Sequence, residues 1–250
     1  MFGFIYGILS YLVFLGVYLG LALFSDGLLL PKTVDSGEPG SFGLALAINV
    51  GLLLVWGLQH SVMARQSFKD RLTRVLPAHL ERSTYMLVSS AALLLLMVAW
   101  QPMAGVVWHV ESTPLASALW ALGALGWVVV PVASLMIDHF DLFGLKQTFM
   151  HWRKRSYDAP SFRAPWLYRY MRHPMMCAFF VAFWATPHMS VSHLVLSLGM
   201  SLYIYIGVHF EERSLVRQLG QAYVDYQART PKFLPKLGGA QAPASATADA

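Results

Sequence analysis

The chain carries apolar runs long enough to cross a lipid bilayer, and this feature limits its fold more than any other. A spanning helix needs about 20 consecutive, mostly apolar residues to match a hydrocarbon core about 30 Å thick. Four runs reach that length, at residues 4–30, 42–63, 85–107 and 115–137. Composition agrees, because 56% of the residues are hydrophobic and only 12% are charged, which excludes an ordinary soluble domain. We therefore predict an all-α integral membrane protein.

A further apolar region, residues 175–209, is interrupted near its middle by Pro187, His188 and His193. We predict two spans there, at 175–188 and 193–209, which resemble a helical hairpin. The first is shorter than a full span, so it is expected to lie in a thinned bilayer or to re-enter. The predicted fold is a bundle of about six transmembrane helices.

Lysine and arginine residues lie almost entirely in alternate connections between these spans. With six spans, 17 of the 18 fall on one side, in residues 64–84, in residues 138–173 and after residue 209. Because basic loops stay in the cytoplasm, both termini are predicted to be cytoplasmic, in a bacterial inner membrane. The same rule explains the net charge of +5 without a nucleic-acid partner. The first run lacks a basic leader region, so we expect a retained anchor helix.

The long connection 138–173 is polar and aromatic, which favours a structured cytoplasmic cap over a bare loop. A C-terminal amphipathic helix is predicted after the last span. We expect one membrane domain over residues 1–237. The tail 238–250 is rich in alanine, glycine, serine and proline, so it is expected to be disordered and dispensable.

Several kinds of site are missing from the sequence. The single cysteine, Cys177, excludes a disulfide framework and a cysteine-based zinc site, and is expected to be a small buried apolar residue. No histidine pair has the i, i+4 spacing of a zinc-protease helix, and no glycine-rich nucleotide-binding motif occurs. We predict no metal site.

An acidic pair, Glu211 and Glu212, begins the predicted C-terminal helix. On a 3.6-residue period, Glu212 shares a stripe with four apolar or aromatic residues, Leu215, Leu219, Tyr223 and Tyr226. Glu212 should therefore point inward and need a partner. Glu211 lies about 100° around the helix. A solvated helix end, or an internal pair with Arg213, is the alternative interpretation.

The tripeptide Arg172-His173-Pro174 stands where the cap re-enters the membrane. Pro174 suits the first turn of a helix, and the free amides there, with Arg172, favour binding of a carboxylate or phosphate. The alternative is an interfacial arginine that anchors the helix to lipid headgroups.

Two more histidines are predicted at the same membrane depth. His60 lies at the inner end of the second span, within Gln59-His60-Ser61, and His139 follows the fourth span. A single intramembrane histidine is often only a satisfied core residue. Their shared level with Arg172 and Glu212 instead favours a common site.

The order of the C-terminal motifs resembles the isoprenylcysteine carboxyl methyltransferase superfamily of integral membrane methyltransferases. These motifs are Tyr168-x-x-x-Arg172-His173-Pro174, Glu211-Glu212-x-x-Leu215, Gly220-x-x-Tyr223-x-x-Tyr226 and Pro231-x-x-x-Pro235. Upstream, the segments 57–65 and 138–145 resemble the nurim-like branch, and the chain to about Leu237 resembles its bacterial thiol-methylating members.

The resemblance implies an S-adenosylmethionine pocket on the cytoplasmic side, with S-adenosylhomocysteine as product. Carried over by position, the cofactor-binding residues are Tyr168, Arg172, His173, Pro174, Glu211 and Glu212. The implied acceptor is a small thiol, methanethiol, which becomes dimethyl sulfide. The superfamily often has tyrosine two residues after the His-Pro start, whereas this chain has Met175 and Met176, so an aromatic wall does not carry over there.

A thiolate that attacks a sulfonium methyl yields two neutral products, so a buried site of low dielectric constant favours the reaction. A small thiol is mostly protonated at neutral pH, and a base is therefore expected. His60 is the first candidate, and His139 or His173 the second; with Glu212, His60 and His139 make up the predicted catalytic set.

Other functions stay open at this point. The acceptor of the same superfamily is alternatively a prenylcysteine carboxylate, a lipid amine or another small thiol. A sterol-type reductase would use NADPH instead, and a nurim-like membrane protein would have no enzymatic role. Membrane lipids and a small thiol are the expected partners, and no obligate protein partner is inferred.

Overall fold

The computed structural model describes residues 1–158 and 162–235. Within them, five helices are long and apolar enough to cross a membrane, which confirms an all-α, multi-pass integral membrane protein: α1 (Phe2–Ser25), α2 (Phe42–Ala64), α4 (Ala78–Ala99), α5 (Thr113–Ile137) and α9 (Val191–Leu219). The shorter elements are α3 (Gln66–Leu72), α6 (His139–Leu142), α7 (Leu145–Trp152), the 3₁₀ helix η1 (Trp166–Arg169), α8 (Pro174–Trp184), α10 (Gln221–Arg229), and the strands β1 (Val106–His109) and β2 (His188–Ser190).

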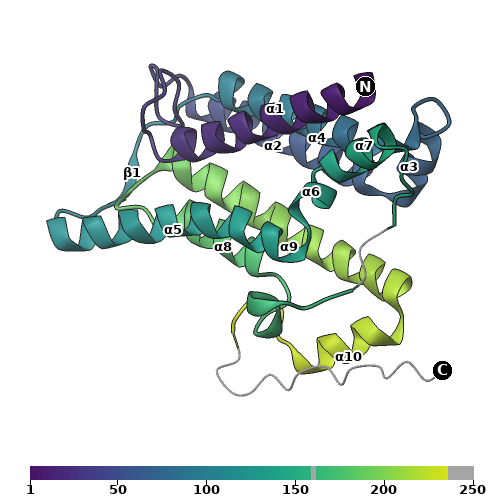
Figure 1. Ribbon diagram of the computed structural model, residues 1–250. Coiled ribbons are helices and arrows are strands. Elements are labelled where there is room, and N and C mark those ends of the chain that lie inside the picture. The colour runs from purple at the N-terminus through teal and green to yellow at the C-terminus, as the bar shows by residue number, and fades with distance from the viewer. Residues whose placement is uncertain (159–161, 236–250) are drawn as a thin grey trace.

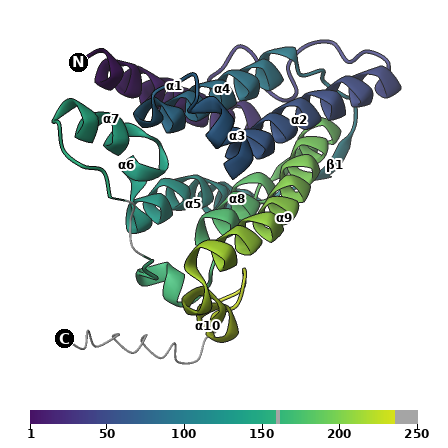
Figure 2. The ribbon, with the colours of Figure 1, turned by 90° about the vertical axis from the view of Figure 1, so that its right-hand side faces the viewer.

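The helices form two groups that α9 connects. In Figure 1, α1, α2 and α4 lie together on one side, and α5 and α8 lie together on the other. Figure 2 shows α9 running beside α2 toward α10. The N-terminus, α7 and α10 lie toward one end of the bundle, and β1 lies at the opposite end (Figure 1).

The prediction of a short span at 175–188 is wrong in length. Helix α8 has only 11 residues, about 16 Å, because it ends at Trp184, ahead of Pro187. The chain nevertheless continues to the far end of the bundle. There β2 pairs with β1 in antiparallel register, with His109 opposite His188. The connections therefore keep the sides assigned to them, and the five long helices together with the short α8 make up the predicted bundle of about six.

Several other span boundaries shift for local reasons. The predicted span 85–107 begins earlier, at Ala78, and ends at Ala99, two residues before the Gln101-Pro102 step that disfavours helix. The predicted span 4–30 ends at Ser25. The last span does not stop at residue 209, because α9 continues through the acidic pair to Leu219. Gly220, with a positive φ of 59°, ends it, and α10 follows.

Helices α5 and α8 approach each other closely through small residues. An added Cβ at Gly126 would lie 2.6 Å from the backbone nitrogen of Ala182, and one at Gly123 would lie 2.6 Å from the carbonyl oxygen of Ala185. Small residues at such a contact allow van der Waals packing of backbones, which drives helix association in lipid. This contact fixes α8, and with it the Arg-His-Pro turn that precedes α8.

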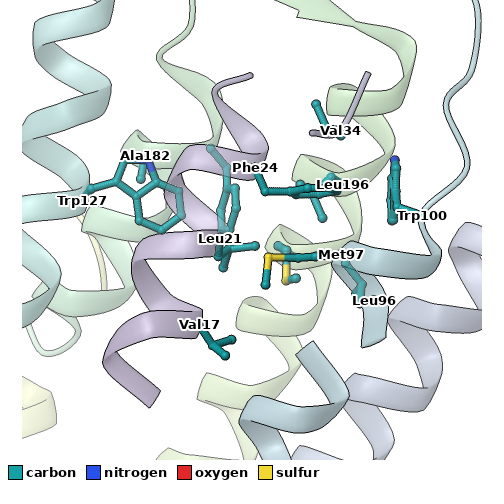
Figure 3. Packing of buried hydrophobic residues seen from close by; sticks show 12 residues of the cluster. Val17, Leu21, Phe24, Val34, Leu96, Met97, Trp100, Trp127, Ala182 and Leu196 are labelled. Carbon is teal, nitrogen blue, oxygen red and sulfur yellow. The ribbon is translucent and has the colours of Figure 1, made fainter. Parts of the chain in front are cut away.

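The hydrophobic core joins both groups of helices (Figure 3). Its fully buried members include Phe24 of α1, Leu96 of α4, Trp100 directly after α4, Phe183 of α8 and Leu196 of α9. Trp127 of α5 packs against Phe183 with ring centroids 5.2 Å apart.

The cap after α5 is structured, as predicted, in the described residues. The Arg82 side chain at the start of α4 donates to the Leu142 carbonyl at 2.7 Å, and Ser83 donates to the Gly144 carbonyl. Phe4 of α1 stacks on Trp152 of α7. The cap therefore holds the beginnings of α1 and α4 together. The single domain 1–237 stays a prediction, and the tail 238–250 lies outside the described residues.

Candidate functional site

A buried carboxylate, Glu212, is the centre of a polar cluster near the end of α9. Its Oε1 accepts from Arg172 Nε at 2.6 Å and lies 3.1 Å from His173 Nε2. Its Oε2 lies 3.1 Å from Lys232 Nζ, and the side chain is only 10% exposed. A buried carboxylate needs such partners, because removing its charge from water costs several kcal/mol. The inward direction predicted for Glu212 from helical phase is confirmed.

Arg172 makes most of its contacts with the protein itself. Its Nη1 donates to the carbonyl of Gln227 at 3.0 Å and to the carbonyl of Thr230. The Arg172 backbone amide donates to the carbonyl oxygen of Pro231 at 2.9 Å. The guanidinium that the sequence suggested for an external carboxylate or phosphate is thus engaged by Glu212 and backbone carbonyls. It fastens residues 227–233, which we term the C-terminal strap, to the Arg-His-Pro turn.

The C-terminal strap covers the start of α8. The His173 amide donates to the Lys232 carbonyl at 3.1 Å, and Cys177 Sγ donates to the Phe233 carbonyl at 2.9 Å. The Phe233 ring lies 6.1 Å from the His173 ring, between centroids. Cys177 is half-buried rather than buried as expected, and its hydrogen bond also ties down the strap. Phe233 supplies an aromatic ring near His173, on a different segment from Met175 and Met176.

Glu211 is the more accessible carboxylate of the acidic pair. Its side chain is 47% exposed, and its Oε2 lies 3.7 Å from Nδ1 of the buried His173. His173 therefore stands between the two carboxylates, with Pro174 in the first turn of α8 as predicted. Burial raises the pKa of Tyr168, and the nearby Glu211 charge raises it further, so the phenol stays protonated and able to donate.

His60 lies in an aromatic box between α2, α4 and α9. Its Nε2 is 2.7 Å from the Tyr85 hydroxyl. The ring stacks on Trp56 at 5.4 Å and meets Tyr203 edge-on at 5.8 Å, between centroids. Among the described residues, His60 Nδ1 is a buried ring nitrogen without a hydrogen-bond partner, and the neighbouring Gln59 Oε1 is likewise unpaired.

His139, by contrast, has partners for both ring nitrogens. Nε2 lies 2.7 Å from the Tyr11 hydroxyl, and Nδ1 lies 2.7 Å from the Ser134 hydroxyl. Burial lowers the pKa of His139, so the ring is neutral at neutral pH. These contacts join α1, α5 and the cap. A structural function accounts for all of them.

The structure brings the six predicted cofactor residues together around the start of α8 and the end of α9. His60 belongs to a second cluster, and His139 to a third, structural one. Tyr203 of the second cluster and Glu211 of the first lie on the same helix, α9, about two turns apart. No group of three metal-ligating side chains was found among residues 1–158 and 162–235.

Sequence reasoning missed several residues of these clusters: Arg82, Tyr85, Tyr203, Lys232 and Phe233. A signal for two of them was present. Arg82, Tyr85 and Ser89 follow the i, i+3, i+7 spacing of one helix face at the basic end of a span. The strap residues had no such signal, because their position depends on tertiary contacts.

A groove of about 360 Å³ opens beside the carboxylate cluster. Glu212, His209, Arg213 and Arg217 line it together with Val216 and Gln227. A second hollow is lined by apolar residues of α1 and α4 and by residues 30–32, which include Lys32, and it contains no residue of either cluster.

The family model described as NnrU protein matches residues 48–242. The chain belongs to the NnrU family. Its relatives include two proteins named methanethiol S-methyltransferase. The one from Mycobacterium tuberculosis is 47% identical over 92% of this chain and 95% of its own length. The one from Pseudomonas sp. (strain GM41(2012)) is 44% identical over 94% of this chain and 90% of its own length. Nurim of Xenopus laevis is 31% identical over 65% of this NnrU-family chain and 60% of its own length. No solved structure matches.

Proposed function

We propose that this NnrU-family chain transfers a methyl group from S-adenosylmethionine to a small thiol, converting methanethiol to dimethyl sulfide. The observation that carries the proposal is the similarity to relatives named methanethiol S-methyltransferase, at 40–47% identity over more than nine-tenths of the chain. Six such proteins share this range, whereas the nurim proteins are less similar and cover less of the chain.

The carboxylate cluster fits this methyl donor. Glu211 offers an accessible carboxylate beside the buried His173, and a carboxylate accepts hydrogen bonds from the hydroxyl and ammonium groups of the donor. Tyr168 adds a protonated phenol, and Phe233 adds an aromatic ring. We propose that Tyr168, His173, Pro174 and Glu211 contact the donor, and that Arg172 and Glu212 act mainly by fixing them in place.

When bound, the donor supplies a methyl group on a positively charged sulfur. The chain's part is to bind the thiol in line with that methyl group, to exclude water and to accept the thiol proton. A thiolate then attacks the methyl carbon, and opposite charges cancel as the neutral thioethers form. Burial favours this step, because charge disappears along the reaction. We propose His60 as the proton acceptor, since both nitrogens of His139 are engaged.

We further propose that the end of the bundle bearing both clusters faces the cytoplasm of a bacterial inner membrane. Seventeen of the 18 lysine and arginine residues belong to connections assigned to that side. Positive-inside topology supports this orientation. Both termini would then be cytoplasmic, and the donor would enter from the cytoplasm.

The proposal is tested with purified protein in lipid nanodiscs, methanethiol and S-adenosylmethionine, by measuring dimethyl sulfide in the headspace. Glu211→Gln is expected to lower donor affinity, and Glu38→Gln, in a remote connection, serves as the matched control. Donor-induced thermal stabilisation without any methylated thiol would point to the carboxylate or lipid-amine acceptors instead. Stabilisation by NADPH would favour the reductase, and stabilisation by neither cofactor would favour the non-enzymatic role.

A further inference from the structure

The aromatic box around His60 is a separate feature from the carboxylate cluster, and nothing in the donor-binding role requires it. Its walls are Trp56 on α2, Tyr85 on α4 and Tyr203 on α9, and the Trp56 and Tyr203 rings lie 4.7 Å apart, between centroids. Three helices from different parts of the chain converge to build it.

Two acceptor atoms inside or beside this box have no hydrogen-bond partner among the described residues: His60 Nδ1 and Gln59 Oε1. An unpaired buried polar atom is costly, so native structures rarely leave two together without a ligand or an ordered water. Gln59 Oε1 requires a hydrogen-bond donor, and so does His60 Nδ1 when the ring proton is on Nε2.

Building on the proposed function, we propose that this box is the acceptor subsite, in which a small alkanethiol places its S–H on His60 Nδ1 and its sulfur against the aromatic rings. Sulfur makes favourable contacts with aromatic edges. The rings in contact here lie 4.7–5.8 Å apart between centroids, which suits an acceptor with few carbon atoms better than a prenylated cysteine.

Tyr85 acts as the positioning residue of this subsite. A neutral imidazole has one N–H and one free lone pair. In the proposed arrangement, Nε2–H donates to the Tyr85 hydroxyl, which leaves the lone pair on Nδ1, the ring nitrogen without a hydrogen-bond partner. Tyr85 then favours the tautomer in which Nδ1 accepts a proton. The titratable or charged groups that face His60 are Tyr85 and Arg82 from α4 and Tyr203 from α9.

In the transfer step, the S–H bond breaks, and its proton passes to His60 Nδ1. The thiolate sulfur then forms a bond to the methyl carbon of the donor, and the old carbon–sulfur bond breaks with its electron pair staying on the donor's sulfur. His60 finally releases the proton to water. One proton is released for each methyl group transferred.

Two acceptors of similar size test this proposal: ethanethiol, a weak acid, and trifluoroethanethiol, whose fluorine atoms lower the pKa of the thiol. His60→Gln is expected to slow methylation of ethanethiol on the order of 10²–10⁴-fold, the usual contribution of a general base. The same substitution should leave the methylation rate of trifluoroethanethiol unchanged, because that thiol already ionises near neutral pH. The residual ethanethiol rate should rise with pH as the thiol itself ionises. Tyr85→Phe should show the same selectivity with a smaller loss, and His109→Gln, at the far end, should change neither rate.

A second measurement does not depend on turnover. The ¹⁵N spectrum of histidine-labelled protein should show one ring, absent in His60→Gln, as the Nε2–H tautomer, and Tyr85→Phe should shift it toward a mixture. Equal loss of both thiols in His60→Gln, or an Nδ1–H tautomer in the wild type, would overturn the acceptor subsite while leaving the proposed function intact. A wild type that methylates neither of these thiols nor methanethiol would overturn both.

Discussion

Arg172 and Glu212, forty positions apart in sequence, form an ion pair of 2.6 Å in which each side chain is only 10% exposed. The side chain of Glu211, the residue directly before Glu212, is 47% exposed. Adjacent carboxylates therefore have different tasks. Glu212 holds the Arg-His-Pro turn and the C-terminal strap in place, and Glu211 is left accessible to a ligand.

Replacing each acid with its amide should separate these tasks. Glu212→Gln leaves Arg172 without its counter-charge, and breaking a buried pair from one side costs about 3–5 kcal/mol. We expect a large drop in the thermal unfolding temperature in nanodiscs. Glu211→Gln should change the free energy of unfolding by no more than about 0.5 kcal/mol, as exposed substitutions usually do, while donor binding weakens. Equal destabilisation by both changes would contradict this division.

Helical periodicity predicted part of this difference between the buried Glu212 and the exposed Glu211. The apolar stripe through Tyr223 and Tyr226 pointed Glu212 inward, and both tyrosines are buried. Periodicity could not identify the partners, because Arg172 and Lys232 approach only after α8 and the strap have folded back. It also treated Arg172 as open to a ligand, whereas backbone carbonyls of the strap engage it.

The membrane class and most spans were likewise readable, because bilayer thickness imposes one length on every spanning helix. The length of α8 could not be predicted in this way, because α8 is too short to span the bilayer. The contact between Gly126 and Ala182 holds it in place. The aromatic box around His60 was also hidden, since Tyr85 and Tyr203 reach His60 from helices whose packing no local pattern reports. His139 shared the predicted depth but proved to be fully hydrogen-bonded.

The close contact between α5 and α8 gives a second prediction. In Gly126→Ala, the new Cβ would lie 2.6 Å from the Ala182 nitrogen, so the helices must separate. Overpacking of this kind typically costs about 1–3 kcal/mol, and the Arg-His-Pro turn would move with α8. Thermal unfolding and donor binding should both weaken.

Gly16→Ala on α1 is the matched control, because no atom lies within 4 Å of its added Cβ. Both positions are interior glycines of long apolar helices. Unchanged stability of Gly126→Ala would show that α5 and α8 are not held by this contact.

His139 gives a prediction about pH. Burial lowers its pKa in the folded state, whereas the unfolded chain has the ordinary value of about 6.5. The unfolded state therefore binds more protons as the pH falls through about 6.5, and stability declines below that point. His139→Gln should be less stable at pH 8 but should show a flatter decline between pH 7 and 5. A wild-type slope unchanged by the substitution would remove His139 from the acid sensitivity.

The C-terminal strap gives the last prediction, through two truncations. Ending the chain after Leu237 removes only the alanine- and glycine-rich tail, so donor binding and unfolding temperature should be preserved. Ending it after Arg229 removes the Thr230 and Pro231 carbonyls that accept from Arg172, the Lys232 ammonium beside Glu212 and the Phe233 ring near His173. Arg172 would keep Glu212 and the Gln227 carbonyl, and Glu212 would keep Arg172 and His173, but both would lose their partners in residues 230–232. His173 would become exposed. We expect a lower unfolding temperature and loss of donor-induced stabilisation, measured by thermal unfolding with and without S-adenosylmethionine. Full donor binding by the shorter chain would show that the strap does not shape the site.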